Sequence, residues 1–322
     1  MIREVKSSWG RYVYAPFVRE SVIEVRAVNG EVGGMAVGSR AGTSVALFAT
    51  CVNDVMYPDT CIATVTLLER LGCRVAFPVE QTCCGQIFTN TGYHAEALGA
   101  VRCYVEAFSS ADYIVGPSGS CVASVRDQHP MLARKTGDAA FIEAVDAVVA
   151  KTYELTEFII DVLGIEDVGA YFPHTVTFHP TCHAVRMAKI GDRPNRLLAQ
   201  VRGLTLLPLE GAEQCCGFGG TFSVKNDLLS AALVADKAAQ VAKTGAEYVV
   251  NVDNACLMNI GGRLHRTKNP VKTIHLAEIL ACTCPDRLGG FDGLGELGVS
   301  GAPSEPCVPS EPNASQEKGR AS

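Results

Sequence analysis

The chain has 322 residues, of which 48% are hydrophobic and 19% are charged, and its formal net charge is −6. This composition is typical of a globular protein with about two domains. The acidic balance and the absence of a long basic run argue against nucleic acid or an anionic membrane surface as a partner. No apolar stretch reaches the roughly 20 residues that span a bilayer, and no secretory signal is evident. We therefore expect a cytoplasmic protein.

The first half of the chain is predicted to alternate strands with helices. Helices are indicated where apolar side chains recur at helical spacing, and short β-branched or aromatic runs indicate strands. The predicted strands are residues 45–49, 74–77 and 113–116. The predicted helices are residues 60–71 and 93–108, one that begins near residues 118–121, and one or two linking helices over 138–163.

The second half repeats this order of elements. The predicted strands are residues 175–178, 204–207 and 248–252. The predicted helices are residues 192–202 and 224–243, and one that begins near Cys256. Alternating strands and helices predict an α/β fold with mostly parallel sheets. We expect two duplicated βαβ-type modules related by a pseudo-twofold axis.

The same pattern sets the expected domain boundaries. The first module is predicted over residues 43–137, a helical linker over 138–172 and the second module over 173–281. Residues 1–42 have no counterpart in the second half, so they are either a disordered extension or an artefact of the start site. Residues 282–322 are predicted to be a disordered tail, because Gly, Pro, Ser and Glu dominate its sequence.

A set of four cysteines occurs once in each module. The members are Cys51, Cys83, Cys84 and Cys121 in the first set, and Cys182, Cys215, Cys216 and Cys256 in the second. The gaps are 31 and 36 residues in the first set, and 32 and 39 residues in the second. Each cysteine follows a predicted strand, and the carboxyl ends of parallel strands share one edge of a sheet. Four thiolates on each edge would form a ligand set for a metal ion or an iron–sulfur cluster.

A glycine follows each vicinal cysteine pair. Adjacent residues of a strand point to opposite faces, so both cysteines reach one centre only where the chain turns sharply. Gly85 and Gly217 permit the positive φ that such a turn requires. Amide N–H groups in these loops are expected to donate to sulfur. The run Gly217-Phe218-Gly219-Gly220 lacks the full dinucleotide-binding pattern, so NAD or flavin binding is not expected.

The remaining cysteines lie outside the repeated pattern. Cys61, Cys73 and Cys103 are expected to be buried and to behave as small apolar residues. Cys282 and Cys284 are too closely spaced for a usual zinc knuckle, and Cys307 falls in the predicted tail. In a long chain of this kind, cysteines are more plausible as ligands in a reducing compartment than as a disulfide framework.

The chain resembles the cysteine-rich CCG-domain proteins, and within them those of lactate utilization. This family includes the B subunit of heterodisulfide reductase and the iron–sulfur subunit of glycolate oxidase. The segments that carry the resemblance are LERLGCRVAFPVEQTCCGQ, VGPSGSCVASVR, YELTEFIIDVLGIEDVGAYFP, EQCCGFGGTFSVK and NACLMNIGGRL. They lie within about residues 43–281, nearly all of the part predicted to fold.

The resemblance implies an iron–sulfur electron-transfer subunit of a complex that oxidises L-lactate to pyruvate. The implied cofactor is one or two iron–sulfur clusters, of the [4Fe–4S] type. The implied partners are a ferredoxin-type iron–sulfur protein and a third lactate-utilization subunit, and the complex as a whole would take a small 2-hydroxy acid as substrate. Whether this chain performs chemistry itself or only relays electrons is left open by the sequence.

One departure from the family pattern concerns the number of cysteines. Motifs of the heterodisulfide reductase type end in Cys-x-x-Cys and supply five cysteines per set. Here Ser118 and Asp253 stand where the first cysteine of that pair would be. Four thiolates suffice for an ordinary [4Fe–4S] centre. A serine or aspartate oxygen as a fifth ligand is left open, and disulfide-reducing chemistry is not expected.

Polar residues near the cysteines have weaker claims to a role. Two interpretations of His183 and Arg186 are weighted equally. Either they belong to the second site, where Arg would hold a carboxylate, or they are ordinary surface residues. His179 is expected to cap a strand end. Gln86 is expected to be a loop residue and His94 a surface histidine of a helix.

Two other functions are kept as alternatives. Four-cysteine sites also suit structural zinc, so a zinc-binding interaction protein is the second hypothesis. A thiol–disulfide oxidoreductase that uses the vicinal cysteines is the third, although it would leave the outer cysteines unexplained.

Overall fold

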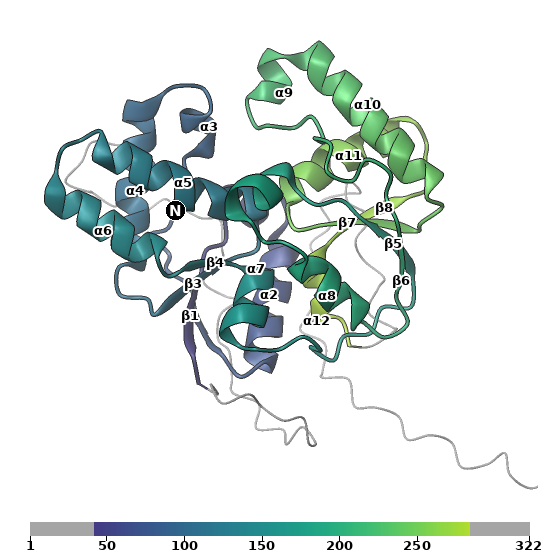
Figure 1. Ribbon diagram of the computed structural model, residues 1–322, viewed down its shortest axis with the longest axis horizontal. Helices are drawn as coiled ribbons and strands as arrows, with labels where there is room; N and C mark the ends of the chain where they lie inside the picture. Colours follow the sequence, from purple (N-terminus) through teal and green to yellow (C-terminus); the bar gives the residue numbers. More distant parts are fainter. Residues whose placement is uncertain (1–41, 284–322) are drawn as a thin grey trace, which may run out of the picture. The chain divides into compact units, whose positions relative to one another are not determined.

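The computed structural model describes residues 42–283, which form two α/β modules (Figure 1). Each module contains an all-parallel sheet of four strands with helices between them, so the predicted fold class and the duplication are confirmed. The predicted N-terminal extension, except for Gly42, and the predicted tail from Cys284 onward lie outside the described residues.

The first module is built on a sheet with the strand order β2-β1-β3-β4. Its strands are β1 (Ser44–Leu47), β2 (Arg74–Ala76), β3 (Tyr113–Gly116) and β4 (Thr152–Glu154). Its helices are α1 (Cys51–Met56), α2 (Pro58–Arg70), α3 (Gln86–Thr89), α4 (His94–Phe108), α5 (Gly119–Arg134) and α6 (Ala139–Val149). After β4 come the short α7 (Leu155–Glu157) and the π-helical turn η1 (Phe158–Val162).

The second module has the equivalent strand order β6-β5-β7-β8. Its strands are β5 (Thr175–Phe178), β6 (Thr205–Leu207), β7 (Tyr248–Asn251) and β8 (Lys272–His275). Its helical elements are η2 (Ala184–Ala188, a π-helical turn), α8 (Arg193–Ala199), α9 (Phe222–Lys225), α10 (Asp227–Lys243), α11 (Asn254–Arg266) and α12 (Leu276–Ala281).

Strand order places a ligand-binding edge in each module. The first strand of each module lies between the second and the third strands. The second strand is therefore added on one side of the first strand, and the third and fourth strands are added on its other side. In open α/β sheets, ligands bind beyond the carboxyl ends of strands at this kind of reversal. Cys51 follows β1 and Cys121 follows β3, and in the second module Cys182 follows β5 and Cys256 follows β7. The fold therefore brings the outer cysteines of each set to the reversal point.

The fourth strand of each sheet was not predicted. β4 pairs with β3, with Ile114 opposite Thr152, although its residues lie in the segment expected to be a helical linker. The expectation of helices alone over residues 138–163 was therefore wrong at Thr152–Glu154. Three residues of mixed polarity are too short for a periodic pattern to indicate a strand. The predicted module boundaries at 137, 172 and 281 remain predictions.

Helices of each module pack against the other module in matching pairs. α5 packs on η2, and α11 contacts α1 in the equivalent place; α12 packs on α2, and α7 contacts α8. Near the middle of this interface a Cβ on Gly119 would lie 2.5 Å from the Cβ of Ala184, so only glycine permits so close an approach of α5 to η2. The reciprocal pairs support the predicted pseudo-twofold relation between the modules.

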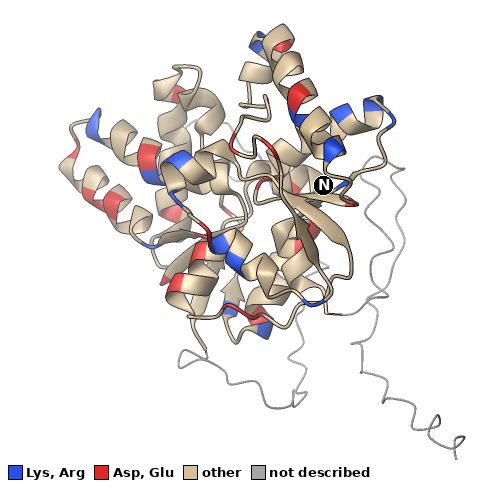
Figure 2. Cartoon of the chain, turned by 45° about the vertical axis from the view of Figure 1, so that its right-hand side comes forward, with Lys and Arg blue, Asp and Glu red and all other residues tan. Residues whose placement is uncertain are grey.

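In the view of Figure 2, Lys and Arg are interspersed with Asp and Glu over the helices. Within residues 42–283, none of the helices has both the length and the apolar character needed to cross a membrane.

Candidate metal centres

The four cysteines of the first set come together at the carboxyl edge of the first sheet. Cys51 Sγ lies 3.5 Å from Cys83 Sγ. Cys84 and Cys121 line the same cavity as Cys51 and Cys83. Thr50, directly before Cys51, is buried and has a φ of 66°, a conformation that is strained for a residue with a Cβ. Strain of this kind concentrates at functional sites.

The cysteines of the second set form the same chain of contacts. Cys182 and Cys215, Cys215 and Cys216, and Cys216 and Cys256 are close enough to shift one another's pKa. Thr181 Oγ1 lies 3.8 Å from Cys256 Sγ. All eight cysteines that the sequence nominated as ligands are thus brought together in two groups of four.

The predicted turn after each vicinal pair is present. Gly85 has a φ of +79° and Gly217 a φ of +83°. The Gly85 amide lies 3.4 Å from Cys83 Sγ, and the Gly217 amide lies 3.3 Å from Cys215 Sγ, each donating to sulfur as expected. These donors stabilise negative charge on the sulfur atoms.

Hydrogen bonding shifts the pKa values of the two cysteines of each vicinal pair in opposite directions. The pKa of Cys83 is well below its usual value because Cys51 and Cys84 donate to its sulfur, and the pKa of Cys215 is lowered by Cys182 and Cys216 in the same way. In contrast, hydrogen bonding and burial raise the pKa of Cys84 and that of Cys216.

A metal resolves the electrostatic problem that each group presents. Four neighbouring thiolates, each at least partly buried, repel one another and lack part of the solvation that water would give them. They ionise together only when a cation lies between them, which is what coordination supplies. The donor set and its electrostatics therefore fit a metal centre in each module.

The turn glycine of the second group gives a test of its geometry. A Cβ at Gly217 would lie 2.7 Å from Ser230 O, whereas one at Gly245 would meet nothing within 4 Å, although its φ of +69° is also positive. Gly217→Ala should lower the free energy of unfolding by about 2–4 kcal/mol, from backbone strain and overpacking combined. Gly245→Ala should cost about 1–2 kcal/mol, from strain alone. Equal losses in urea denaturation would show that the turn tolerates a side chain.

The cavity at the first group reaches into the second module. It has a volume of about 50 Å³ and is lined by all four cysteines of the first group. It is also lined by Phe218 and Gly220, which follow the second vicinal pair, and by Asp253 and Ala255, which precede Cys256. Sequence reasoning considered Asp253 and the glycine run only in connection with the second module and missed their place at the first cavity, since nothing in their local pattern reports a contact made across two modules.

Ser118 and Asp253, which replace the family's fifth cysteines, meet at the interface. Ser118 is the N-cap of α5 and accepts from the Cys121 amide, while Asp253 is the N-cap of α11 and accepts from the Ala255 amide. Asp253 Oδ2 also accepts from the Ser120 amide at 2.9 Å and from Ser118 Oγ at 3.4 Å. Both side chains are buried. Their oxygens cap helices and join the modules.

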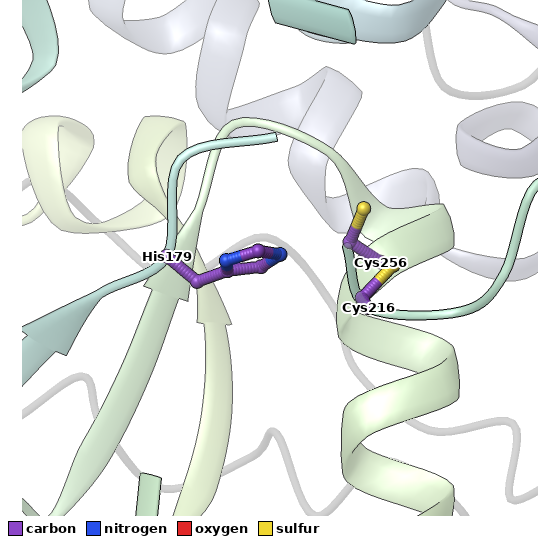
Figure 3. Close-up of side chains that lie close together, drawn as sticks. All are labelled: His179, Cys216 and Cys256. Carbon is purple, nitrogen blue, oxygen red and sulfur yellow. The ribbon is translucent and has the colours of Figure 1, made fainter. Parts of the chain in front are cut away.

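His179 occupies a different position from the one expected of a simple cap. It is fully buried, and its Nδ1 donates to the Ala212 carbonyl at 2.9 Å. Burial lowers the pKa of His179 to about 4, so the ring is neutral. Among the described residues its Nε2 has no hydrogen-bond partner. A nitrogen of this ring and the sulfur atoms of Cys216 and Cys256 lie within 4.8 Å of one another, and Figure 3 shows the outer end of the ring turned toward the two cysteines.

The other nominated polar residues are placed as follows. Gln86 is the first residue of α3, lines the first cavity and donates to the Ser120 carbonyl, so the expectation of a plain loop residue was wrong. His94 lies on α4 with Nδ1 2.9 Å from Lys135 Nζ, in agreement with a helix-surface role. His183 Nδ1 lies 3.5 Å from Cys182 Sγ. The neighbouring Cys215 and burial raise the pKa of Cys182, and the positive charge of the exposed Arg186 opposes this rise.

The cysteines outside the two groups differ in burial. Cys73 is buried and Cys61 is half-buried. Cys103 is exposed on α4, so the prediction that it is buried was wrong; its helical position faces away from the sheet. Cys282 is half-buried, and Cys284 and Cys307 lie outside the described residues.

Comparison with known proteins identifies the two modules. The family model described as "Cysteine-rich domain" (CCG) matches twice, at residues 45–126 and 176–261. The two matches contain all four cysteines of the first group and all four of the second.

Curated relatives match nearly their entire length. The chain is 49% identical over 239 residues to "Lactate utilization protein A" of an Exiguobacterium species, covering 74% of this chain and 96% of the relative. It is 47% identical over 236 residues to the protein of the same name from Geobacillus kaustophilus, covering 73% and 98%. A solved structure of a hypothetical protein from Helicobacter pylori aligns with a TM-score of 0.53 at 11% identity, over 77% of this chain and 51% of that one. At that identity the likeness concerns the fold alone.

Proposed function

Because the chain belongs to the cysteine-rich domain (CCG) family, we propose that it is an iron–sulfur electron-transfer subunit of a system that oxidises L-lactate to pyruvate. The name of the relatives, "Lactate utilization protein A", supports the link to lactate. In this reaction lactate loses two electrons and two protons. The role of this chain is to accept electrons and pass them on.

One observation carries the proposal: the two groups of thiols face one interface. The cavity at the first group is lined by residues that directly neighbour the second group, namely Phe218, Asp253 and Ala255. Electron transfer between two centres needs them to be close together. A purely structural metal has no such requirement.

The number of thiols in each module is compatible with a cluster. Four cysteines of the first module line one cavity, and Cys51 Sγ lies 3.5 Å from Cys83 Sγ. Four thiolates are the ligand number of an ordinary [4Fe–4S] cluster, so we propose a cluster rather than a single ion.

The protein residues would hold and tune a cluster. An iron–sulfur cluster supplies one-electron oxidation and reduction when it is bound. The Gly85 and Gly217 amides donate to sulfur, which favours the reduced, more negative state. Lys237 is buried and donates to the Gly211 carbonyl at 2.6 Å, and the charge of its ammonium group interacts with the cysteines of the second group. A positive charge there stabilises additional electrons.

The proposed setting is a cytoplasmic assembly. A ferredoxin-type iron–sulfur protein and a third lactate-utilization subunit are the proposed partners, and a small 2-hydroxy acid is the substrate of the assembly. The exposed Arg186 beside Cys182 is one cationic group near the second centre that suits a carboxylate.

Anaerobic purification tests the cluster. We expect coloured protein with iron and acid-labile sulfide in equal amounts, and an electron paramagnetic resonance signal after reduction. Colourless protein with stoichiometric zinc would contradict the proposal and support a structural zinc protein. Protein with neither metal, in which the vicinal cysteines exchange disulfides, would support the thiol–disulfide alternative.

A further inference from the structure

We propose that His179 Nε2 is a ligand of the second metal centre, beside the thiolates of Cys216 and Cys256, so that the two centres of this chain have different ligand sets. The identity of the metal rests on the proposed function, whereas the ligand assignment rests on the geometry of the described residues.

The hydrogen bond of His179 fixes which ring nitrogen carries its lone pair. A carbonyl oxygen only accepts, so Nδ1, which lies 2.9 Å from Ala212 O, carries the proton. In the neutral ring Nε2 is then unprotonated, the form in which imidazole binds metals. A backbone carbonyl on the other nitrogen is the usual partner of a histidine that ligates a metal.

The ring is held in place by its surroundings. The Ala212 carbonyl belongs to a loop to which Lys237 Nζ donates at 2.6 Å on Gly211 O and at 3.4 Å on Ala212 O. His179 and Lys237 are both buried. The imidazole is therefore oriented before any metal binds, and its free nitrogen is not available to water.

The free nitrogen points at the cysteines. Figure 3 shows the imidazole extending from the end of β5 toward Cys216 and Cys256. The three ligand atoms lie within 4.8 Å of one another, and all three residues are buried. A buried nitrogen without a hydrogen-bond partner is costly to the fold, and a bond to a metal would satisfy it.

The first module shows what this position looks like without a ligand. Phe48 and His179 are equivalent, since each directly follows the first strand of its module and lies three residues before the first cysteine. Their amides make the matching bonds, Phe48 N to Val115 O and His179 N to Val250 O. Phe48 packs edge-on against Tyr104, with the ring centroids 5.1 Å apart. The first centre thus has four candidate ligand atoms and the second has five.

Protein enriched in the iron isotope that Mössbauer spectroscopy detects gives a direct test of the histidine ligand. Mössbauer spectroscopy detects every iron whatever its spin state, so a nitrogen-ligated iron should give a distinct component in the wild type. The component should be lost in His179→Phe, which introduces the residue found at the equivalent position of the first module. It should be kept in His183→Phe, which removes the imidazole beside Cys182. Identical spectra for wild type and His179→Phe would overturn the proposal.

A second measurement uses the wild type alone, so it tests the proposal even if the His179→Phe variant does not fold. Electron–nuclear double resonance of reduced protein that contains isotopically labelled histidine should show a strongly coupled histidine nitrogen. If the second centre is paramagnetic and its spectrum lacks that coupling, the ligand assignment is overturned. Metal and sulfide analysis of the same sample separates the two proposals. If the protein holds zinc, the cluster proposal fails, and zinc-edge absorption should then show a nitrogen at about 2.0–2.1 Å if His179 is a ligand, or sulfur alone if it is not.

Discussion

Cys84→Ser should remove the metal of the first centre and leave that of the second largely intact. Cys84 is buried at the middle of the first chain of thiols, where it contacts both Cys83 and Cys121. A serine hydroxyl is a poor replacement for a thiolate toward a soft metal. We expect about half of the iron and sulfide of the wild type, measured on anaerobically purified protein.

Two controls define what this result would mean. Cys103→Ser removes an exposed cysteine outside both groups and should leave the metal content unchanged. Cys216→Ser is the equivalent change in the second group and should remove the other half. Loss of all metal from Cys84→Ser in protein that stays folded would show that the two centres assemble together rather than independently.

The predictable part of this molecule is the part encoded by local pattern. Buried runs such as Val45–Leu47 indicate a strand, and a cysteine directly after a strand indicates the carboxyl edge of a sheet. Gly85 and Gly217 were predicted as turn residues because few other residues adopt a positive φ. Repetition of the pattern strengthened each assignment, since two independent accidents would be needed to produce it.

The unpredicted part depends on contacts between distant residues. His179 was expected to cap a strand, and no local pattern indicates that its ring faces Cys216 and Cys256. Its difference from Phe48 is visible in the sequence, but the consequence depends on the loop at Ala212 that orients the ring. Phe218 reaches the first cavity because the two modules pack face to face, and the order of elements along one chain does not specify that packing.

Asp253→Ala should destabilise the protein by about 2–4 kcal/mol, because it leaves two partly buried amides without their acceptor. The Asp253 carboxylate accepts from the Ala255 amide at the start of α11 and from the Ser120 amide of the other module. Its burial, at 2% exposure, keeps water from replacing either bond. The loss is expected in urea denaturation of the metal-free protein, so that the stability of the fold is measured apart from that of the centres.

A matched substitution isolates the contribution of the interface. Asp138 is the N-cap of α6 and accepts from the Phe141 amide at 3.1 Å, and no bond from it to the second module accompanies this cap. Asp138→Ala should therefore cost only about 1 kcal/mol, the usual value of an N-cap. Equal losses from the two variants would mean that the bond from Asp253 to Ser120 adds nothing to the association of the modules.

Asp253→Asn decides between the two roles left open for this residue. The amide keeps an oxygen that can cap α11 by accepting from Ala255, but it removes the negative charge that a metal ligand would need. Because both carboxylate oxygens are already bonded to groups of the protein, we expect the variant to retain the full metal content of the wild type. Loss of the second centre on this change alone, in protein that stays folded, would instead identify Asp253 as a ligand. The structure favours the first outcome, since Asp253 Oδ1 accepts from the Ala255 amide at the start of α11 and Oδ2 accepts from the Ser120 amide of the other module.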